Sequence, residues 1–405
     1  MRLMLNALGA SEIQEVEKTL NVPYLYLTAY GGHIQPYMLD YNGKQFALGL
    51  SEKTDPNGAS RIYAYQNNNG VIDGDYVTPG TTPDFSDTNH SFPSLAIHED
   101  YLYFAQVQGH LNSIDIWKSD APLDASSFTK IAVIPKGTGD FDGFAYPNLF
   151  FDNGVMYIYC RSDYFASNLS STLIKSTNVN FTAFDIVWLF DYDAETANHR
   201  WALYPCSPQH YGVNSWRYFI INLRNSKTQS GVDGYERVYL CKTQDYKNFY
   251  NLDETIFTDS SLGPYNITAN NNFLIETSSS YQKNIGPVLG VVIDDTIVYY
   301  IRDENNLGSV KLVSLSVLGK SELQFLTGLN TGTGSFVLNM YVIKGQILII
   351  ANFDGGLKKK YLINPDLTGL EVLNEDEKYN RIPYIINSNR YMRAKQGNEQ
   401  IDVNF

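Results

Sequence analysis

Two histidines, His90 and His110, flank a run of strand-forming residues and could meet at one chemical site. Residues 95–108 between them favour two β-strands joined by a turn at Glu99-Asp100, which is the pattern of a hairpin. Because the paired strands of a hairpin begin and end at the same edge of a sheet, the residues just outside it can converge there. Imidazole groups at such an edge suit acid–base chemistry or metal binding better than they suit a core.

Turns of this kind recur along the chain at a nearly constant interval. Each has turn-forming residues between apolar or aromatic flanks, as β-hairpins do. The turns lie at Asn42-Gly43, Glu99-Asp100, Asp152-Asn153-Gly154, Asp294-Asp295 and Lys344-Gly345. Residues 43, 100 and 154 are 57 and 54 positions apart, and residues 295 and 345 are 50 positions apart. This spacing indicates a unit of several short strands that repeats along the chain.

A second motif, a strand followed by a turn and an aromatic residue, marks the same unit. Its three degenerate versions are Trp117-Lys118-Ser119-Asp120 with Phe128, Ile174-Lys175-Ser176-Thr177 with Phe181, and Cys241-Lys242-Thr243-Gln244-Asp245 with Phe249. A repeat of about 50–65 residues with several strands is typical of a β-propeller blade. The fold class predicted is all-β, a β-propeller of about seven blades, with six as the alternative. A sandwich or a β-helix is not expected to repeat a hairpin at so long an interval.

One short helix is expected near the N-terminus. Ser11-Glu12-Ile13-Gln14 has the pattern of a capping box, and Ile13, Val16 and Leu20 follow at helical spacing. We therefore expect an N-terminal segment of residues 1–22, whose helix could attach to an assembly partner, and a single propeller domain of residues 23–405. No linker or low-complexity segment divides that domain.

Composition supports a many-stranded fold and excludes some partners. The chain has 31 Tyr and 21 Phe, and only 18% of its residues are charged. The formal net charge is −13 and the short run Lys358-Lys359-Lys360 does not offset it, so no nucleic-acid partner is expected. No run of about 18 apolar residues occurs, so no membrane insertion is expected. The first eight residues make no convincing signal peptide. We expect an extracellular or virion-associated protein, which either is exported by another route or has a leader that is missing from this sequence.

The three cysteines predict neither a disulfide framework nor a cofactor. The cysteines are far apart in the sequence and form no CxxC motif, which favours buried free thiols. They are Cys160, Cys206 and Cys241. Cys206 and His210 are four residues apart and could bind zinc together with Cys241. Three scattered ligands do not predict a metal site, so we expect no cofactor and keep a structural metal ion as the alternative.

Five segments follow one another in the order of a known family. They are Asn89-His90-Ser91-Phe92-Pro93-Ser94-Leu95-Ala96-Ile97, Gly109-His110, residues 119–128, Tyr146-Pro147-Asn148-Leu149, and Tyr157-Ile158-Tyr159-Cys160-Arg161-Ser162. Over roughly residues 40–250 this order resembles the BNR-repeat propellers that include the ulvan lyases. The resemblance implies a seven-bladed propeller that cleaves a sulfated algal polysaccharide by β-elimination at a uronic acid.

The same resemblance implies which residues form the active site. It places catalytic roles on His90, Tyr146 and Arg161, and substrate binding on His110, Asn89 and, less directly, Tyr204. The sequence departs from the family in two ways. The Asp-box turn with Gly and Trp is absent, and residues 162–182 contain no His or Cys to match the zinc ligands of the family.

The chemistry of elimination explains these residue types. Removal of the C5 proton of a uronate requires a cation that neutralises the carboxylate, and Arg161 can bind a carboxylate with two parallel hydrogen bonds. His90 or Tyr146 is the candidate base, and Tyr146 could also protonate the departing O4. His110 would position the substrate or assist in neutralising it.

Two other functions fit the same sequence. A non-catalytic propeller that binds a receptor glycan, such as a phage tail component, fits the N-terminal segment and the many Tyr and Asn. A glycoside hydrolase would need a pair of carboxylates, and the candidates in loops are Asp84, Asp87, Asp142 and Asp163. The remaining histidines, His33, His98, His199 and His210, are expected at the surface or in structural roles, and Tyr211 competes with Tyr204.

Overall fold

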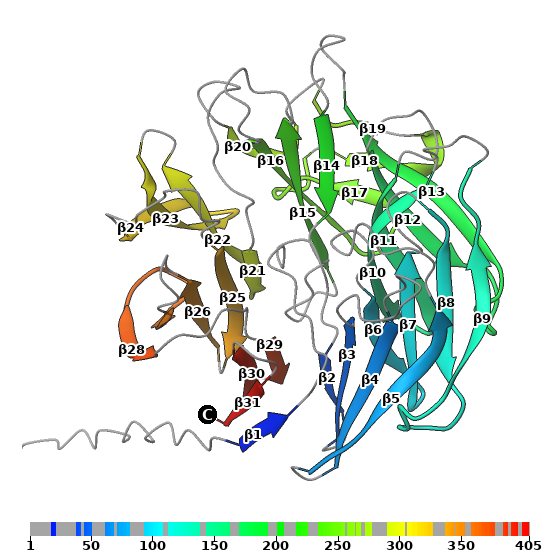
Figure 1. Ribbon diagram of the computed structural model, residues 1–405. Helices are drawn as coiled ribbons and strands as arrows, with labels where there is room; N and C mark the ends of the chain where they lie inside the picture. The colour runs from blue at the N-terminus through cyan, green and yellow to red at the C-terminus, as the bar shows by residue number, and fades with distance from the viewer. Residues whose placement is uncertain are drawn as a thin grey trace, which may run out of the picture.

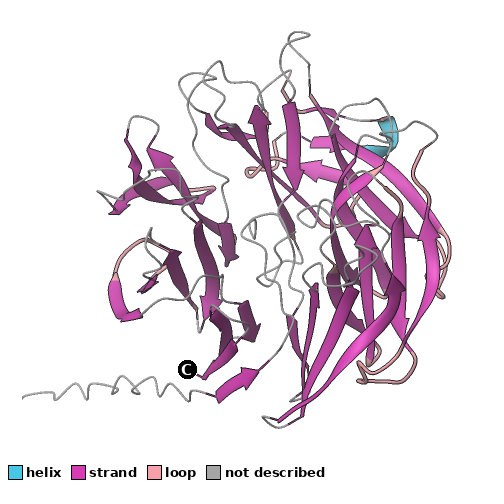
Figure 2. Cartoon of the chain, in the orientation of Figure 1, coloured by secondary structure: helices cyan, strands magenta, loops and turns pink. Residues whose placement is uncertain are grey.

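The protein is built almost entirely from antiparallel strands, as the computed structural model shows (Figure 1). The structure describes residues 18–21, 38–41, 44–50, 61–68, 71–81, 93–107, 112–137, 143–162, 170–192, 201–205, 216–225, 234–255, 257–263, 265–268, 272–277, 290–303, 306–326, 337–343, 345–352, 358–376, 384–387, 390–395 and 399–404. Among them, the 3-10 helix η1 (Ser260–Leu262) is the one helical segment (Figure 2). No helix in these ranges is long and apolar enough to cross a membrane.

The described strands pair into seven sheets, of which three come from the first half of the chain. The first sheet contains β2 (Met38–Tyr41), β3 (Lys44–Leu50), β4 (Arg61–Asn68) and β5 (Val71–Thr81). The second contains β6 (Ser94–His98), β7 (Tyr101–Val107), β8 (Ile114–Ser119) and β9 (Phe128–Ile134). The third contains β10 (Phe144–Asp152), β11 (Val155–Ser162), β12 (Ser170–Ser176) and β13 (Phe184–Asp191).

The next three sheets continue the series around the molecule (Figure 1). The fourth contains β14 (Trp201–Pro205), β15 (Arg217–Asn225), β16 (Gly234–Thr243), β17 (Asn248–Tyr250), β18 (Phe257–Asp259) and β20 (Leu274–Thr277). The fifth contains β21 (Gly290–Ile293), β22 (Thr296–Asp303), β23 (Asn306–Ser316) and β24 (Gly319–Leu326). The sixth contains β25 (Val337–Ile343), β26 (Gln346–Asn352), β27 (Lys358–Ile363) and β28 (Glu371–Asp376). Strand β19 (Tyr265–Asn266) joins the edge of the third sheet beside β13.

The seventh sheet joins the two ends of the described chain. It contains β29 (Tyr384–Asn387), β30 (Arg390–Lys395), β31 (Glu399–Asn404) and the first strand, β1 (Lys18–Asn21). Strand β1 lies antiparallel to β31 (Figure 1). Successive meanders whose last sheet is completed by the first strand form a closed β-propeller, as the repeat predicted.

The prediction of a helix near the N-terminus is wrong for the C-terminal end of that helix. Leu20, which was to lie on its apolar face, is in β1 and pairs with Gln400 of β31. The capping box is a local signal, whereas the pairing with β31 is a tertiary contact that overrides it. Residues 11–17, which include the rest of that helix, lie outside the described residues.

The predicted hairpin turns are confirmed, and each joins the first two strands of a sheet. The two-residue turns at Glu99-Asp100, Asn153-Gly154 and Asp294-Asp295 all have positive φ angles, between 46° and 76°. That backbone matches the right-handed twist of the flanking strands. Residues 42, 43 and 344 lie outside the described residues, but the strands on either side of them pair as hairpins.

The core lies between successive sheets, because the middle strands carry apolar residues on both faces. On β11, Ile158 and Cys160 pack with Ile116 of the second sheet. On the other face of the same strand, Tyr159 packs with Phe219 of the fourth sheet, their ring centroids 4.9 Å apart. The third sheet therefore buries apolar surface against both of its neighbours.

Polar contacts tie the sheets together at the end where the first hairpin turns lie, here named the turn end. Arg217 of β15 forms an ion pair of 2.7 Å with Asp152, at the turn of the third sheet. The next residue, Tyr218, donates a hydrogen bond of 2.6 Å from its hydroxyl to Asp295 in the turn of the fifth sheet. The turns of the third and fifth sheets therefore lie on the same side of the ring, and the opposite side is named the far end.

The serine of the second sequence motif has a structural role. The hydroxyl of Ser119, at the end of β8, accepts a hydrogen bond of 3.0 Å from the backbone N–H of Leu102 in β7. Ser176, at the end of β12, accepts one of 3.1 Å from the N–H of Met156 in β11. The repeated serine thus satisfies a buried donor next to the hairpin turns of the second and third sheets.

Replacing this serine should destabilise the fold. Ser176→Ala leaves the buried N–H of Met156 without its acceptor, which costs about 1–3 kcal/mol. We expect the melting temperature to fall by a few degrees in a thermal unfolding experiment. Ser126→Ala, on an exposed loop, is the control and should leave the melting temperature unchanged. Equal melting temperatures for Ser176→Ala and the control would show that the motif serine does not support the hairpin.

Candidate active site

Tyr146 and Arg161 lie together at the far end of the third sheet. The Arg161 guanidinium carbon is 4.8 Å from the centroid of the Tyr146 ring, which places the cation over the face of the phenol. Strand pairing brings Arg161 opposite Ala145, the residue before Tyr146. Both side chains are buried, with 4% of Tyr146 and 1% of Arg161 exposed.

A β-bulge in β10 gives Tyr146 its direction. Ala145 pairs with Arg161 and Asn148 pairs with Tyr159, so Tyr146 and Pro147 together oppose the single residue Cys160. The extra residue bends the strand and re-aims a side chain, as bulges do beside functional sites. Pro147 has no N–H to lose from the ladder, which suits a bulge. Tyr146 itself has a φ of 56°, in the region that L-residues rarely adopt.

The side-chain amide of Asn148 closes the bulge. Its Nδ2 atom donates one hydrogen bond to the carbonyl oxygen of Tyr146 and another to that of Tyr159, both of 3.0 Å. Asn148 is fully buried. In the sequence, Asn148 stands out only as part of the motif Tyr146-Pro147-Asn148-Leu149. A proline inside a strand, followed by an amide, is the signal that indicates a bulge.

The guanidinium of Arg161 is held in a low-dielectric setting. A buried charge is costly unless its surroundings compensate it, and the face of an aromatic ring is one such partner. On the next strand, Ser171 lies opposite Arg161. The Ser171 hydroxyl donates a hydrogen bond of 2.6 Å to the hydroxyl of Tyr159, two residues before Arg161 on β11. The residue that faces Arg161 on β12 is therefore hydrogen-bonded back to β11.

The second sheet contacts β10 on both sides of Tyr146. The N–H of Phe144 donates a hydrogen bond of 3.0 Å to the carbonyl oxygen of Asn112, in the connection between β7 and β8. The N–H of Leu149 donates one of 2.9 Å to the hydroxyl of Ser94, the first residue of β6. The second sheet thus contacts β10 at Phe144 and at Leu149, and neither bond involves the Tyr146 peptide.

The structure brings together two of the six predicted site residues, Tyr146 and Arg161. Asn89, His90 and His110 lie outside the described residues, as do the four loop aspartates proposed for a hydrolase. Tyr204 is in β14, where it pairs with Asn222 of β15, and only its backbone is described. The roles predicted for these residues stay predictions.

The one described histidine has a structural role. His98 stacks on Phe151, with ring centroids 4.6 Å apart, and meets Phe181 edge-on at 5.6 Å. Its side chain is 21% exposed. This packing agrees with the structural role expected for it.

Neither described thiol is suited to bind a metal or act as a nucleophile. Cys160 and Cys241 are fully buried, and burial raises the pKa of both thiols, which keeps them protonated. Within the ranges that the structure describes, no group of three or more His, Cys, Asp or Glu residues could hold a metal ion. Cys206 and His210, the other two candidate zinc ligands, lie outside those ranges.

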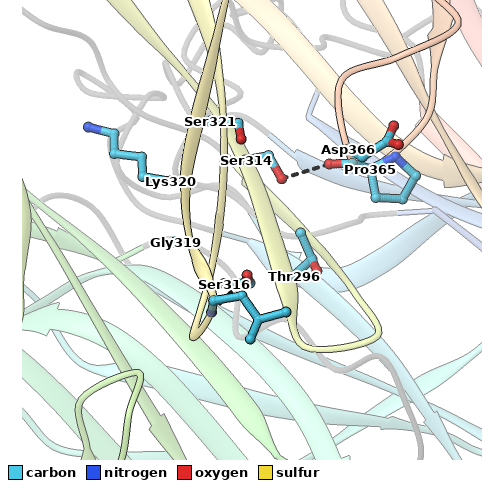
Figure 3. A pocket seen from close by; sticks show the side chains of 9 residues that line it. Thr296, Ser314, Ser316, Gly319, Lys320, Ser321, Pro365 and Asp366 are labelled. Carbon is cyan, nitrogen blue, oxygen red and sulfur yellow. Dashed lines mark hydrogen bonds between the residues drawn. The ribbon is translucent and has the colours of Figure 1, made fainter.

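A pocket lies between the fifth and sixth sheets, apart from the Tyr146–Arg161 pair. Its lining includes the hydroxyls of Thr296 and Ser314 and the side chain of Lys320 (Figure 3). The Ser314 hydroxyl donates a hydrogen bond of 2.7 Å to the carbonyl oxygen of Pro365, and Lys320 pairs with Glu276. Thr296 directly follows the turn of the fifth sheet, so the pocket lies at the turn end, away from Tyr146.

Solved structures of polysaccharide lyases resemble this chain. The polysaccharide lyase Uly1 matches with a TM-score of 0.66 and 11% identity over 94% of this chain and 92% of that one. An ulvan lyase of family PL25, bound to -[GlcA(1-4)Rha3S]-, matches with a TM-score of 0.64 and 12% identity over 96% of both chains. The shared fold is a β-propeller. No family model and no curated sequence matches the chain.

Alkaline pH should destabilise the protein through its buried phenols. Burial raises the pKa of Tyr103 and of Tyr157 to about 12, whereas an unfolded tyrosine has a pKa of about 10. Each of these phenols has a higher pKa in the folded state than in the unfolded state. The stability that the phenol contributes is therefore complete below pH 10 and is lost as the pH rises through 12.

Denaturant unfolding of the wild type and of Tyr103→Phe between pH 9 and pH 12 measures this effect. We expect the free energy of unfolding to fall over the interval, and to fall less steeply in Tyr103→Phe because one ionising phenol is gone. A variant that loses stability as steeply as the wild type would show that the Tyr103 phenol does not contribute.

Proposed function

We propose that the protein is a polysaccharide lyase that cleaves an acidic, uronic acid-containing glycan by β-elimination. The observation that carries the proposal is the contact between the Arg161 guanidinium and the Tyr146 ring at the far end of the third sheet. A guanidinium beside a phenol unites the two functions that elimination requires, charge neutralisation and proton transfer. Likeness of fold to ulvan lyases, one of them bound to a glucuronate-containing glycan, supports the same substrate class.

The reaction can be written with the residues of this chain. Arg161 binds the carboxylate at C6 of the uronate and neutralises it, which makes the C5 proton more acidic. A base, Tyr146 as phenolate or His90, takes that proton. The electron pair left at C5 forms the C4–C5 double bond while the C4–O4 bond breaks, and the departing oxygen receives a proton from Tyr146. The Arg161 cation beside the ring would stabilise negative charge that develops on the phenol.

The covalent chain limits how far the two histidines can be from this site. His110 is two residues from Asn112, whose carbonyl accepts a hydrogen bond from Phe144, and two extended residues span at most about 7 Å. His90 is four residues before Ser94, which contacts Leu149, and four residues span at most about 14 Å. The roles of His90 and His110 at this site are part of the proposal.

Burial of the pair favours a second candidate, a propeller that binds glycans without cleaving them. With 4% of Tyr146 and 1% of Arg161 exposed, the two groups also suit a structural cation–π contact. The pair lies at the far end, where β10 begins and β11 ends. A binder would retain glycans at the ring but release no product, and this difference separates the two functions.

Tyr146→Phe should remove most of the lyase activity. The variant keeps the ring over Arg161 but has no hydroxyl to transfer a proton, and general acid–base groups contribute about 10²–10⁴-fold in rate. The assay follows the ultraviolet absorbance of the unsaturated uronate in digests of uronic acid polysaccharides. Tyr157→Phe, which removes a buried phenol from the same sheet, is the control and should retain the activity. New reducing ends without this absorbance would indicate a hydrolase instead.

Arg161→Lys should impair both binding and catalysis. Lysine keeps the positive charge but cannot form the bidentate pair with a carboxylate, so we expect kcat/KM to fall by about 10–10³-fold. Reduction of the uronate carboxyls to alcohols should abolish cleavage by the wild type for the same reason. Equal rates for Arg161→Lys and the wild type would exclude Arg161 as the carboxylate-binding group.

A further inference from the structure

We propose that Asn148 is a positioning residue, whose side-chain amide fixes the bulge that holds the Tyr146 phenol over the Arg161 guanidinium. Its catalytic consequence rests on the proposed lyase function, whereas its effect on the position of Tyr146 does not. Asn148 lies two residues after Tyr146, and both hydrogen bonds of its Nδ2 atom end on backbone carbonyl oxygens.

The two acceptors explain why the position requires an amide. The register shift lies at Tyr146 and Pro147, and there the carbonyl oxygen of Tyr146 accepts a hydrogen bond from the Asn148 amide. The carbonyl oxygen of Tyr159, on the facing strand, is the second acceptor. An NH₂ group has two donor hydrogens and can bridge both. A carboxylate of the same shape has none, and its charge would face two carbonyl oxygens.

The backbone of Tyr146 is the part that needs support. Its φ of 56° is unfavourable for a tyrosine, and a residue that precedes proline favours an extended backbone. Such a conformation persists only where the surrounding structure determines it. The hydrogen bond from Asn148 to the Tyr146 carbonyl fixes the peptide that follows the strained residue, and so fixes the direction of its ring.

A neighbouring hydrogen bond allows the role of Asn148 in positioning Tyr146 to be distinguished from general support of β10. Leu149, directly after Asn148, is fixed by the Ser94 hydroxyl at 2.9 Å, and Ser94 is as deeply buried as Asn148. That bond attaches β10 to the second sheet but does not involve the Tyr146 peptide. Loss of either contact should reduce stability, whereas only loss of the Asn148 amide should move the ring.

The test compares Asn148→Asp and Asn148→Ser with the control Ser94→Ala, each with 3-fluorotyrosine at position 146. Aspartate removes both donors, and serine keeps one hydroxyl donor on a shorter side chain. We expect the fluorine NMR resonance to shift in both Asn148 variants and to stay in place in Ser94→Ala. We expect the melting temperature to fall in all three variants. A lower melting temperature in Ser94→Ala without a shift of the fluorine resonance shows that loss of stability alone does not move the Tyr146 ring. Should Asn148→Asp fail to fold, Asn148→Ser decides.

Kinetics then connect the position of the ring to the reaction. We expect kcat of the Asn148 variants to fall by about tenfold to a hundredfold with a smaller change in KM, since a displacement of about 1 Å can cost that much. Ser94→Ala should keep the wild-type kcat. Asn148 variants whose fluorine signal and kcat match those of the control would overturn the proposal. If the wild type performs no elimination, the lyase function fails, and the fluorine signal alone decides the role of Asn148.

Discussion

Apolar packing between successive sheets is the interaction on which the rest of the molecule depends. On β11, alternate residues face opposite neighbours, so the same strand contributes Ile158 to one interface and Tyr159 to the next. Burial of both faces leaves little freedom to shift a strand, because a slip of one residue would exchange the two interfaces. Packing therefore holds the strands in register from the turn end to the far end, where Tyr146 and Arg161 lie.

The sequence predicted the parts of the fold that local chemistry determines. Turns such as Asn153-Gly154 need residues that accept a positive φ, and that requirement is visible in the chain. The first strand was not predictable in this way, since Leu20 finds its partner in Gln400, at the other end of the molecule. A capping box close to Leu20 could not indicate a contact at that separation.

The same distinction applies to the candidate site. The types and order of Tyr146 and Arg161 singled them out, and the structure places them in contact. Their orientation depends on the register of β10 against β11, because the bulge exists only once Ala145 pairs with Arg161 and Asn148 with Tyr159. A register is a property of two strands together, so no single segment could reveal that Asn148 would face two carbonyl oxygens.

Closure of the ring by β1 and β31 has a consequence for synthesis of the chain. Among the described strands, β1 is synthesised first and its partner β31 (Glu399–Asn404) last. Until then, β1 has no sheet to join, and the outermost sheets each lack the neighbour that covers one apolar face. Unpaired strand edges and exposed apolar faces promote association with other chains. Until β31 is made, the strands already synthesised thus form an open arc, which the pairing of β31 with β1 closes.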